Sequence, residues 1–283
     1  MEYSFWIPDF NRAKNYEEKY PLTARIFEHP TAIWLTGSSK CYKTVERSIQ
    51  RTINRASPDL PIFVVYAIPN RDLGQYSKGG LTNSEYIGFC KRIASGIGDN
   101  KVILIFEPDA MPHLSDMDVA DAKERMLVMK QALGVLGTSS ALIYVDVGHS
   151  NWHRPSDVAV QLSEFAENNI KGFSINVSNF RTTKEAIAWG NEVSKLLDNT
   201  LTYVIDTSRN GVGPLDNYWC NPPERALGLP PTTYTSSRQC DAYLWIKIPG
   251  ESDGTGCGGP VAGKFWAEYA ETLVRNSPYV SNS

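Results

Sequence analysis

The sequence has no excess of basic residues and no long apolar run. Its 283 residues include 28 Lys and Arg against 31 Asp and Glu, which gives a formal net charge of −3 at pH 7. Binding to nucleic acid needs a basic face that displaces counterions, so this charge balance argues against a nucleic-acid partner. No apolar stretch approaches the roughly 20 residues that a membrane-spanning helix needs, which argues against a membrane partner.

Motifs for metals and nucleotides are missing as well. The five cysteines fit no metal-binding spacing, and their odd number leaves at least one thiol unpaired. His149 and His153 are four residues apart but lack the intervening glutamate of a zinc-binding helix. No predicted strand is followed by a glycine-rich dinucleotide fingerprint or a phosphate-binding P-loop. We therefore expect no metal and no cofactor.

Seven short apolar runs rich in β-branched residues alternate with helical stretches. Runs such as IFVVYAI and KVILIF are almost continuously hydrophobic, as strands covered on both faces must be. The predicted strands are residues 31–37, 62–69, 101–109, 141–149, 172–179, 202–208 and 243–250. Helical periodicity is clearest at 118–136 and 156–165. This alternation predicts a parallel α/β sheet, either open and doubly wound or closed into a barrel.

Polar residues at the ends of most predicted strands favour the barrel. Barrel enzymes gather their site from the C-terminal ends of many strands, whereas an open sheet concentrates it at one switch point. The region 209–241 lacks helical periodicity and is rich in Pro, Gly and Asn, which predicts a long loop region over the barrel mouth. Because no linker is visible, we expect a single domain over residues 1–283.

Carboxylates dominate these strand ends. Hydrolysis of a glycosidic bond needs a protonated carboxyl to donate a proton to the leaving oxygen, and a second group to activate water or attack the sugar. Two carboxylates close together raise the pKa of one of them, which keeps it protonated near neutral pH. Acidic strand ends also serve metal-dependent enzymes, so the cluster alone leaves a barrel lyase or aldolase open beside a hydrolase.

Seven motifs follow the predicted strands and loops in order. They are PNRD at 69–72, FEPDA at 106–110, YVDVGHSNW at 144–152, NVSNF at 176–180, DTSRNG at 206–211, WCN at 219–221 and WIKIPGESDG at 245–254. Together they resemble glycoside hydrolase family 6, the cellulases that comprise endoglucanases and cellobiohydrolases. The resemblance implies a distorted, seven-stranded parallel β/α barrel, a variant of the TIM barrel, and this agrees with the independent strand count.

Three aspartates carry the chemistry that the resemblance implies. Asp109 matches the proton donor, and Asp72 matches the neighbouring carboxylate that raises the donor's pKa and helps to relay a proton through water. Asp253 matches the proposed base, although the cationic neighbours Arg209 and Lys247 would weaken it in that role. The resemblance leaves open whether Asp253 or a relay through Asp72 takes the proton. Inversion requires carboxyls about 6.5–9.5 Å apart, with a water between them.

Aromatic and polar residues match the family's sugar-binding groups. Tyr66 matches the ring that crowds the sugar at the cleaved bond, and Ser77 matches the serine that holds the attacking water. Three tryptophans match stacking platforms, namely Trp34, Trp152 and Trp219. The other predicted substrate-binding residues are Arg71, Asp146, His149, Asn179, Lys247 and Glu251. The implied partner is a β-1,4-glucan chain, such as cellulose or a cello-oligosaccharide, bound by a monomer.

The resemblance further implies a disulfide between Cys220 and Cys257 that pins the 209–241 loops. The family's earlier disulfide is absent, because Leu73 stands where the family often has a cysteine. Three cysteines have no family partner, namely Cys41, Cys90 and Cys240. The first thirty residues are too polar for a signal peptide, so we expect a secreted protein from which that peptide has been removed.

Two features favour an endoglucanase over a cellobiohydrolase. Only GTGCGGPVAGK separates Asp253 from Phe265, which is too short to roof the site into a tunnel. Pro155 stands where cellobiohydrolases carry an additional tryptophan. An open cleft predicts cleavage within the β-1,4-glucan chain, with inversion. The alternatives are a cellobiohydrolase of the same family and an inactive glucan-binding domain on the same scaffold.

Some charged residues have an ordinary structural interpretation. The charge run at 118–130 predicts a solvated helix face, and His113 is interpreted as a surface residue. Glu107 is expected to support the site from beneath. For Asp206 and Arg209, an ion pair that merely holds a loop is as plausible as a direct role in the site.

Overall fold

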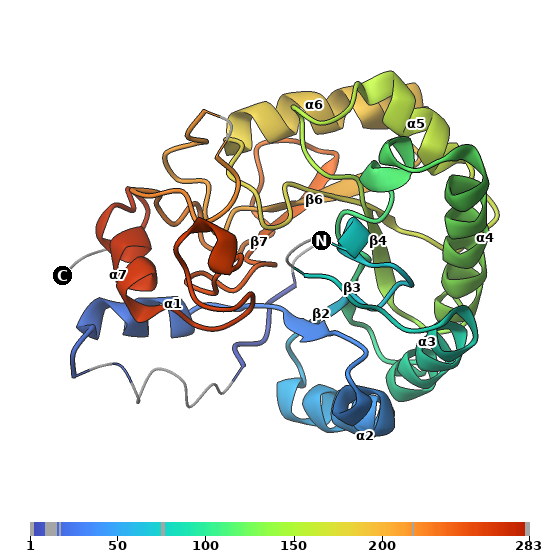
Figure 1. Cartoon of the computed structure of the whole chain (residues 1–283), viewed down its shortest axis with the longest axis horizontal. Helices are drawn as coiled ribbons and strands as arrows, with labels where there is room; N and C mark the ends of the chain where they lie inside the picture. Colours follow the sequence, from blue (N-terminus) through green and yellow to red (C-terminus); the bar gives the residue numbers. More distant parts are fainter. Residues whose placement is uncertain (1–2, 9–15, 17, 75–76, 217, 281–283) are drawn as a thin grey trace.

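Seven parallel strands lie side by side in chain order in one curled sheet (Figure 1). This computed structural model describes residues 3–8, 16, 18–74, 77–216 and 218–280. The strands are β1 (Ile33–Leu35), β2 (Ile62–Val65), β3 (Ile103–Phe106), β4 (Leu142–Asp146), β5 (Gly172–Ile175), β6 (Thr202–Asp206) and β7 (Cys240–Leu244). Each strand pairs in parallel with the next, so that the carboxyl ends of all seven lie along one rim.

The predicted parallel sheet is confirmed, but a closed barrel is not. In the described part of the chain β1 and β7 are the edges of the sheet and share no ladder. One backbone hydrogen bond joins their surroundings, from the Ala32 N–H to the Trp245 carbonyl at 3.2 Å. The predicted last strand, 243–250, was placed too late, because residues 245–250 are buried but irregular. Their apolar character reflects burial without a strand partner.

Helices cover the outer face of the sheet. Figure 1 shows α2 to α6 as an arc around the curl, with α1 and α7 on the other side. The helices are α1 (Ala24–Phe27), α2 (Ser39–Ala56), α3 (Asn83–Ile97), α4 (Val119–Leu136), α5 (Pro155–Ser163), α6 (Thr183–Leu196) and α7 (Ala267–Arg275). Side chains cap several N-termini, including a reciprocal capping box between Thr82 and Glu85 in α3. No helix within the described ranges combines the length and apolarity of a bilayer crossing.

Alternate residues of the strands enter two different cores. In β2, Phe63 and Val65 pack into the cluster beneath α2 to α6, whereas Ile62 and Val64 pack into a second cluster inside the curl. Both faces of the sheet are therefore buried, which explains the continuous hydrophobic runs of the sequence. A third cluster around α7 includes Trp245 and lies beside the gap between the sheet edges.

Left-handed backbone is concentrated where β2, β3 and β5 end. The non-glycine residues concerned are Asn70, Asp72, Leu73, Glu107, Asp109, Asn176 and Ser178, with φ between 43° and 69°. Such conformations cost on the order of 1–3 kcal/mol each and persist only where their surroundings hold them. The chain thus turns sharply at this rim, and the polar side chains of the sequence motifs gather there.

Candidate active site

Two adjoining cavities open at the carboxyl rim of the sheet. Their volumes are about 450 and 380 Å³. Both are lined by Asp72, Asp109, Asn179 and Trp219, so the two aspartates stand where the cavities meet. An elongated ligand lying through both would therefore pass these carboxyls near its middle.

Most of the predicted site residues line these cavities. In addition to the shared four, the larger cavity is lined by Trp34, Tyr66, Arg71, Ser77, Lys247, Glu251 and Asp253. The smaller one adds two predicted residues, His149 and Trp152. Residues from β1 through the segment after β7 thus converge, although long stretches of sequence separate them.

The surroundings of Asp109 favour the protonated form of its carboxyl. Burial is the main cause that raises its pKa, to about 6, and the negative charges of Asp72 and Asp253 act in the same direction. His113 and Lys247 oppose this rise in pKa. At neutral pH a useful fraction of Asp109 therefore remains protonated and able to donate a proton.

Asp146 supports Asp109 from below and does not line either cavity. Its carboxylate is fully buried and accepts hydrogen bonds from the backbone N–H groups of Asp109 (2.9 Å) and Gly148 (3.2 Å), and from the Ser174 hydroxyl (3.1 Å). Burial raises its pKa well above the ordinary value. Asp146, predicted to contact a sugar, is therefore buried outside both cavities, where its carboxylate binds the backbone of Asp109.

Asp253 lies in a cationic environment. Arg209 donates two hydrogen bonds to it, at 2.8 and 3.0 Å, and the Lys247 amine is 3.4 Å away. Burial alone would raise the pKa of Asp253, but Arg209 and Lys247 outweigh burial and lower it. Arg209 pairs with Asp253 and not with Asp206, whose carboxylate accepts backbone N–H groups instead. The loop-holding ion pair between Asp206 and Arg209 is therefore absent.

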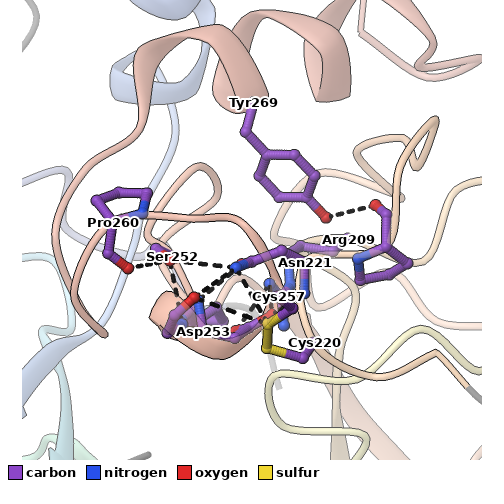
Figure 2. Close-up of a disulfide and its surroundings, with 11 residues drawn as sticks. Arg209, Cys220, Asn221, Ser252, Asp253, Cys257, Pro260 and Tyr269 are labelled. Atoms are coloured by element: carbon purple, nitrogen blue, oxygen red, sulfur yellow. Dashed lines mark hydrogen bonds and ion pairs between the residues drawn. A yellow bond between two sulfur atoms is a disulfide. The ribbon is translucent and has the colours of Figure 1, made fainter.

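A disulfide stands beside this carboxylate (Figure 2). Cys220 and Cys257 are bonded, with their Cα atoms 6.0 Å apart, and this confirms the pairing implied by the sequence. Next to it, the Asn221 backbone N–H donates to Asp253 Oδ2 (2.9 Å), and the Asp253 N–H donates back to Asn221 Oδ1 (2.8 Å). The disulfide thus joins the two segments that carry this reciprocal pair. The three cysteines without a family partner, Cys41, Cys90 and Cys240, are free in this structure.

Aromatic rings form one wall of the larger cavity. Trp34 and Tyr66 meet edge to face with centroids 5.2 Å apart, and the Arg71 guanidinium lies 4.5 Å from the centre of the Tyr66 ring. The Trp34 indole donates to the Ile246 carbonyl at 2.9 Å, which ties β1 to the segment after β7. Ser77 faces the same cavity, and its backbone N–H donates to Asp72 at 2.6 Å.

Histidines surround Trp152 in the smaller cavity. His113 packs edge to face against its indole at 4.9 Å, and His149 lies 5.5 Å away. His113 is only 8% exposed and its Nδ1 is 2.9 Å from Asp116 Oδ2, so the interpretation of it as a surface residue was wrong. The sequence feature that could have predicted His113 as a site residue is its spacing of four residues from Asp109. Burial and Arg181 lower the pKa of His149 to about 4.

Among the described residues no group of three or more His, Cys, Asp and Glu side chains is arranged to hold a metal ion. Asp253 instead binds Arg209 and Lys247, and Asp72 accepts a hydrogen bond from the Ser77 backbone N–H. A family model for glycosyl hydrolases family 6 matches residues 7–277. The chain belongs to glycosyl hydrolases family 6.

Relatives in family 6 match along most of this chain. Endoglucanase A of Cellulomonas fimi is 36% identical over 278 residues, covering 97% of this chain and 59% of that protein. Endoglucanase 1 of Streptomyces sp. (strain KSM-9) is 37% identical over 252 residues, covering 87% of this chain and 69% of that protein. The chain thus spans less than two thirds of the length of the first of these relatives.

A solved family 6 structure has the same fold. It is the endoglucanase Cel6 from Mycobacterium tuberculosis in complex with methyl-cellobiosyl-4-deoxy-4-thio-β-D-cellobioside. The identity is 38%, the TM-score is 0.91, and 97% of each chain is covered.

Proposed function

We propose that this chain is an endo-β-1,4-glucanase that hydrolyses cellulose or a related β-glucan with inversion. The observation that carries the proposal is an acid with a raised pKa, Asp109, beside Asp72 where two cavities meet. A glucan chain lying through both cavities would present an internal glycosidic bond to these carboxyls. Membership of family 6, with endoglucanases among its relatives, supports the same conclusion.

In the proposed reaction the protonated Asp109 donates its proton to the glycosidic oxygen as the bond breaks. Water attacks the anomeric carbon from the opposite face, which inverts its configuration. Asp72 raises the pKa of Asp109 and helps to relay the proton of the attacking water, while Ser77 holds that water. Tyr66 crowds the sugar at the cleaved bond.

Asp253 is a weak candidate for the base that accepts the proton. Its ion pairs with Arg209 and Lys247 keep it ionised and lower its affinity for a proton. We therefore favour the water relay through Asp72, and propose that Asp253 orients Arg209 and Lys247 at the site.

Sugar binding is assigned to the cavity walls. Trp34 and Trp219 are the proposed stacking platforms in the larger cavity, and Trp152 is the platform in the smaller one. The proposed hydrogen-bonding groups are Arg71, His149, Asn179, Lys247 and Glu251.

Endo action is supported by the short segment after Asp253. Residues 254–264 form one short helical turn, η5 (Thr255–Cys257), and a loop whose Val261 is 68% exposed. Trp219 is 49% exposed at the rim, where a cleft open to solvent could admit the middle of a chain. We further propose that residues 1–283 act as one catalytic domain of a secreted monomer, without nucleic-acid or membrane partners. The Ala32 and Trp34 hydrogen bonds would complete its distorted barrel.

The test is hydrolysis of carboxymethyl-cellulose, followed by viscosity and reducing ends together, with the product anomer read by NMR. We expect viscosity to fall early relative to reducing-end release, an α-anomeric product, and a rate that a chelator leaves unchanged. Steady cellobiose release with little loss of viscosity would indicate a cellobiohydrolase instead. Binding of cello-oligosaccharides without turnover of any β-glucan would indicate an inactive glucan-binding domain.

A further inference from the structure

Arg125 of α4 is a buried arginine outside both cavities. It lies in the charge run predicted to be a solvated helix face, yet it is only 5% exposed, so that prediction was wrong at this position. Its Nη2 donates to the backbone carbonyls of Pro69 (3.2 Å) and Asn70 (2.9 Å). Its Nη1 is buried without a hydrogen-bond partner in the described part of the chain. Both of these hydrogen bonds of the guanidinium therefore go to one short stretch of backbone.

That stretch leads directly into the site. Pro69 and Asn70 immediately precede Arg71 and Asp72, which line the larger cavity. The turn is sharply bent, because Asn70, Asp72 and Leu73 all have left-handed backbone. Each left-handed residue is energetically unfavourable, so the turn would relax to a lower-energy backbone unless other contacts held it.

Inside the cavity the same turn is held by Arg71. Its side chain donates to the carbonyls of Thr36 (3.2 Å), Tyr66 (2.5 Å) and Ser77 (2.8 Å). Arg71 thus holds the cavity side of the turn, while Arg125 holds the carbonyls on the side of α4. Without Arg125, the carbonyls of Pro69 and Asn70 lose these two hydrogen bonds to α4.

Burial of Arg125 is costly, which argues against an incidental contact. Removing a guanidinium from water is unfavourable unless hydrogen bonds replace its hydration, and here one nitrogen remains unpaired. Burial lowers the pKa of Arg125, and the charges of Glu107 and Asp121 oppose that effect. Hydrogen bonds from a charged donor to two carbonyls offset part of this cost.

We propose that Arg125 is a positioning residue: by holding the carbonyls of Pro69 and Asn70, it fixes where Asp72 stands relative to Asp109. The inference rests on the proposed function, because its consequence is a change in the proton donor. Asp72 raises the pKa of Asp109, so an Asp72 that drifts away lets that pKa fall. If Arg125 positions Asp72, its loss therefore moves the pH profile of activity. If Arg125 only stabilises the fold, its loss leaves that profile where it was.

The experiment compares Arg125→Met, Arg125→Lys and a matched control, Lys123→Met, which removes an exposed positive charge from the same helix. We expect Arg125→Met to lower kcat on carboxymethyl-cellulose by about 10- to 100-fold, the effect of a small misplacement of a catalytic group, with KM within about threefold. The alkaline limb of its kcat/KM profile moves to lower pH. Arg125→Lys, which keeps one donor, restores part of both changes, and the control behaves as wild type.

Amide hydrogen exchange measures the turn independently of catalysis. The N–H groups of Arg71, Leu73 and Ser77 are hydrogen-bonded within or beside the turn, and we expect them to exchange faster in the Arg125 variants. If Arg125→Met does not fold, Arg125→Lys carries the test. Unchanged exchange, or lost activity with an unmoved alkaline limb, would overturn the proposal. A wild-type protein inactive on every β-glucan would refute the proposed function, while the exchange result would still decide whether Arg125 holds the turn.

Discussion

Replacement of Asp109 by asparagine removes the proposed proton donor while keeping the size of the side chain. The ordinary pKa of this carboxyl is 3.8, and its surroundings raise it to about 6. At pH 7 about one-tenth of Asp109 is then protonated, compared with less than about one-thousandth for an ordinary aspartate. The site therefore holds roughly 100-fold more of the acid in its active form.

Two consequences follow for the pH dependence and for the variant. The alkaline limb of kcat/KM in the wild type should have its midpoint near pH 6, because the free enzyme must hold this proton. In Asp109→Asn that limb should disappear, and turnover of β-glucan should fall by about 10²- to 10⁴-fold, the usual contribution of a general acid.

The assay uses two substrates that differ in their need for a proton. Carboxymethyl-cellulose has a poor leaving group, whereas a dinitrophenyl cello-oligosaccharide has a leaving group that departs without protonation. We expect Asp109→Asn to lose the first activity and keep most of the second. Turnover of carboxymethyl-cellulose within tenfold of wild type, or an alkaline limb that persists near pH 6, would refute the assignment of Asp109 as the acid.

Three further predictions test neighbouring groups. Asp72→Asn removes a negative charge that raises the pKa of Asp109, so the alkaline limb of kcat/KM should move to lower pH; an unmoved limb would contradict this. Replacing Cys220 and Cys257 together by serine should lower the free energy of unfolding by about 2–4 kcal/mol, measured by urea denaturation; an unchanged midpoint would show that the disulfide adds no stability. Arg209→Met leaves the buried Asp253 with fewer partners and should cost about 3–5 kcal/mol in the same measurement, whereas a loss below 1 kcal/mol would mean that water replaces the guanidinium.

The number of strands and their succession along the chain could be predicted from the sequence because hydrophobic runs are local, whereas their order in the sheet followed only from the strand-end pattern and the family resemblance. The closure of the sheet could not, since it depends on how β1 packs against the residues after β7. The apolar stretch 245–250 illustrates the limit. Burial requires the same residue types whether a segment is a strand or an irregular chain: Trp245 packs in the cluster around α7 and Ile246 in the cluster inside the curl.

Some of the site residues could likewise be predicted from the sequence, and others could not. The motifs bring Asp72 and Asp109 to the rim, because each follows a buried strand that ends there. The motifs place Asp146 among the sugar-binding groups, but whether its side chain reaches a cavity depends on how the chain packs at the ends of β3 and β4. In the structure Asp109 lines both cavities, whereas Asp146 is buried and lines neither. Arg125 was missed for another reason: its partners are backbone carbonyls, which leave no mark on the sequence.

The left-handed backbone at the carboxyl rim has a consequence for how this protein can change. Leu73 and Ser178, for example, have φ of 43° and 60°, where glycine would fit without strain. Glycine would relieve the steric cost of this backbone but would raise the conformational entropy that folding must overcome. Leu73 follows Asp72 directly and Ser178 lines the larger cavity, so any stability gained by a change at either position comes with a change beside the groups of the site.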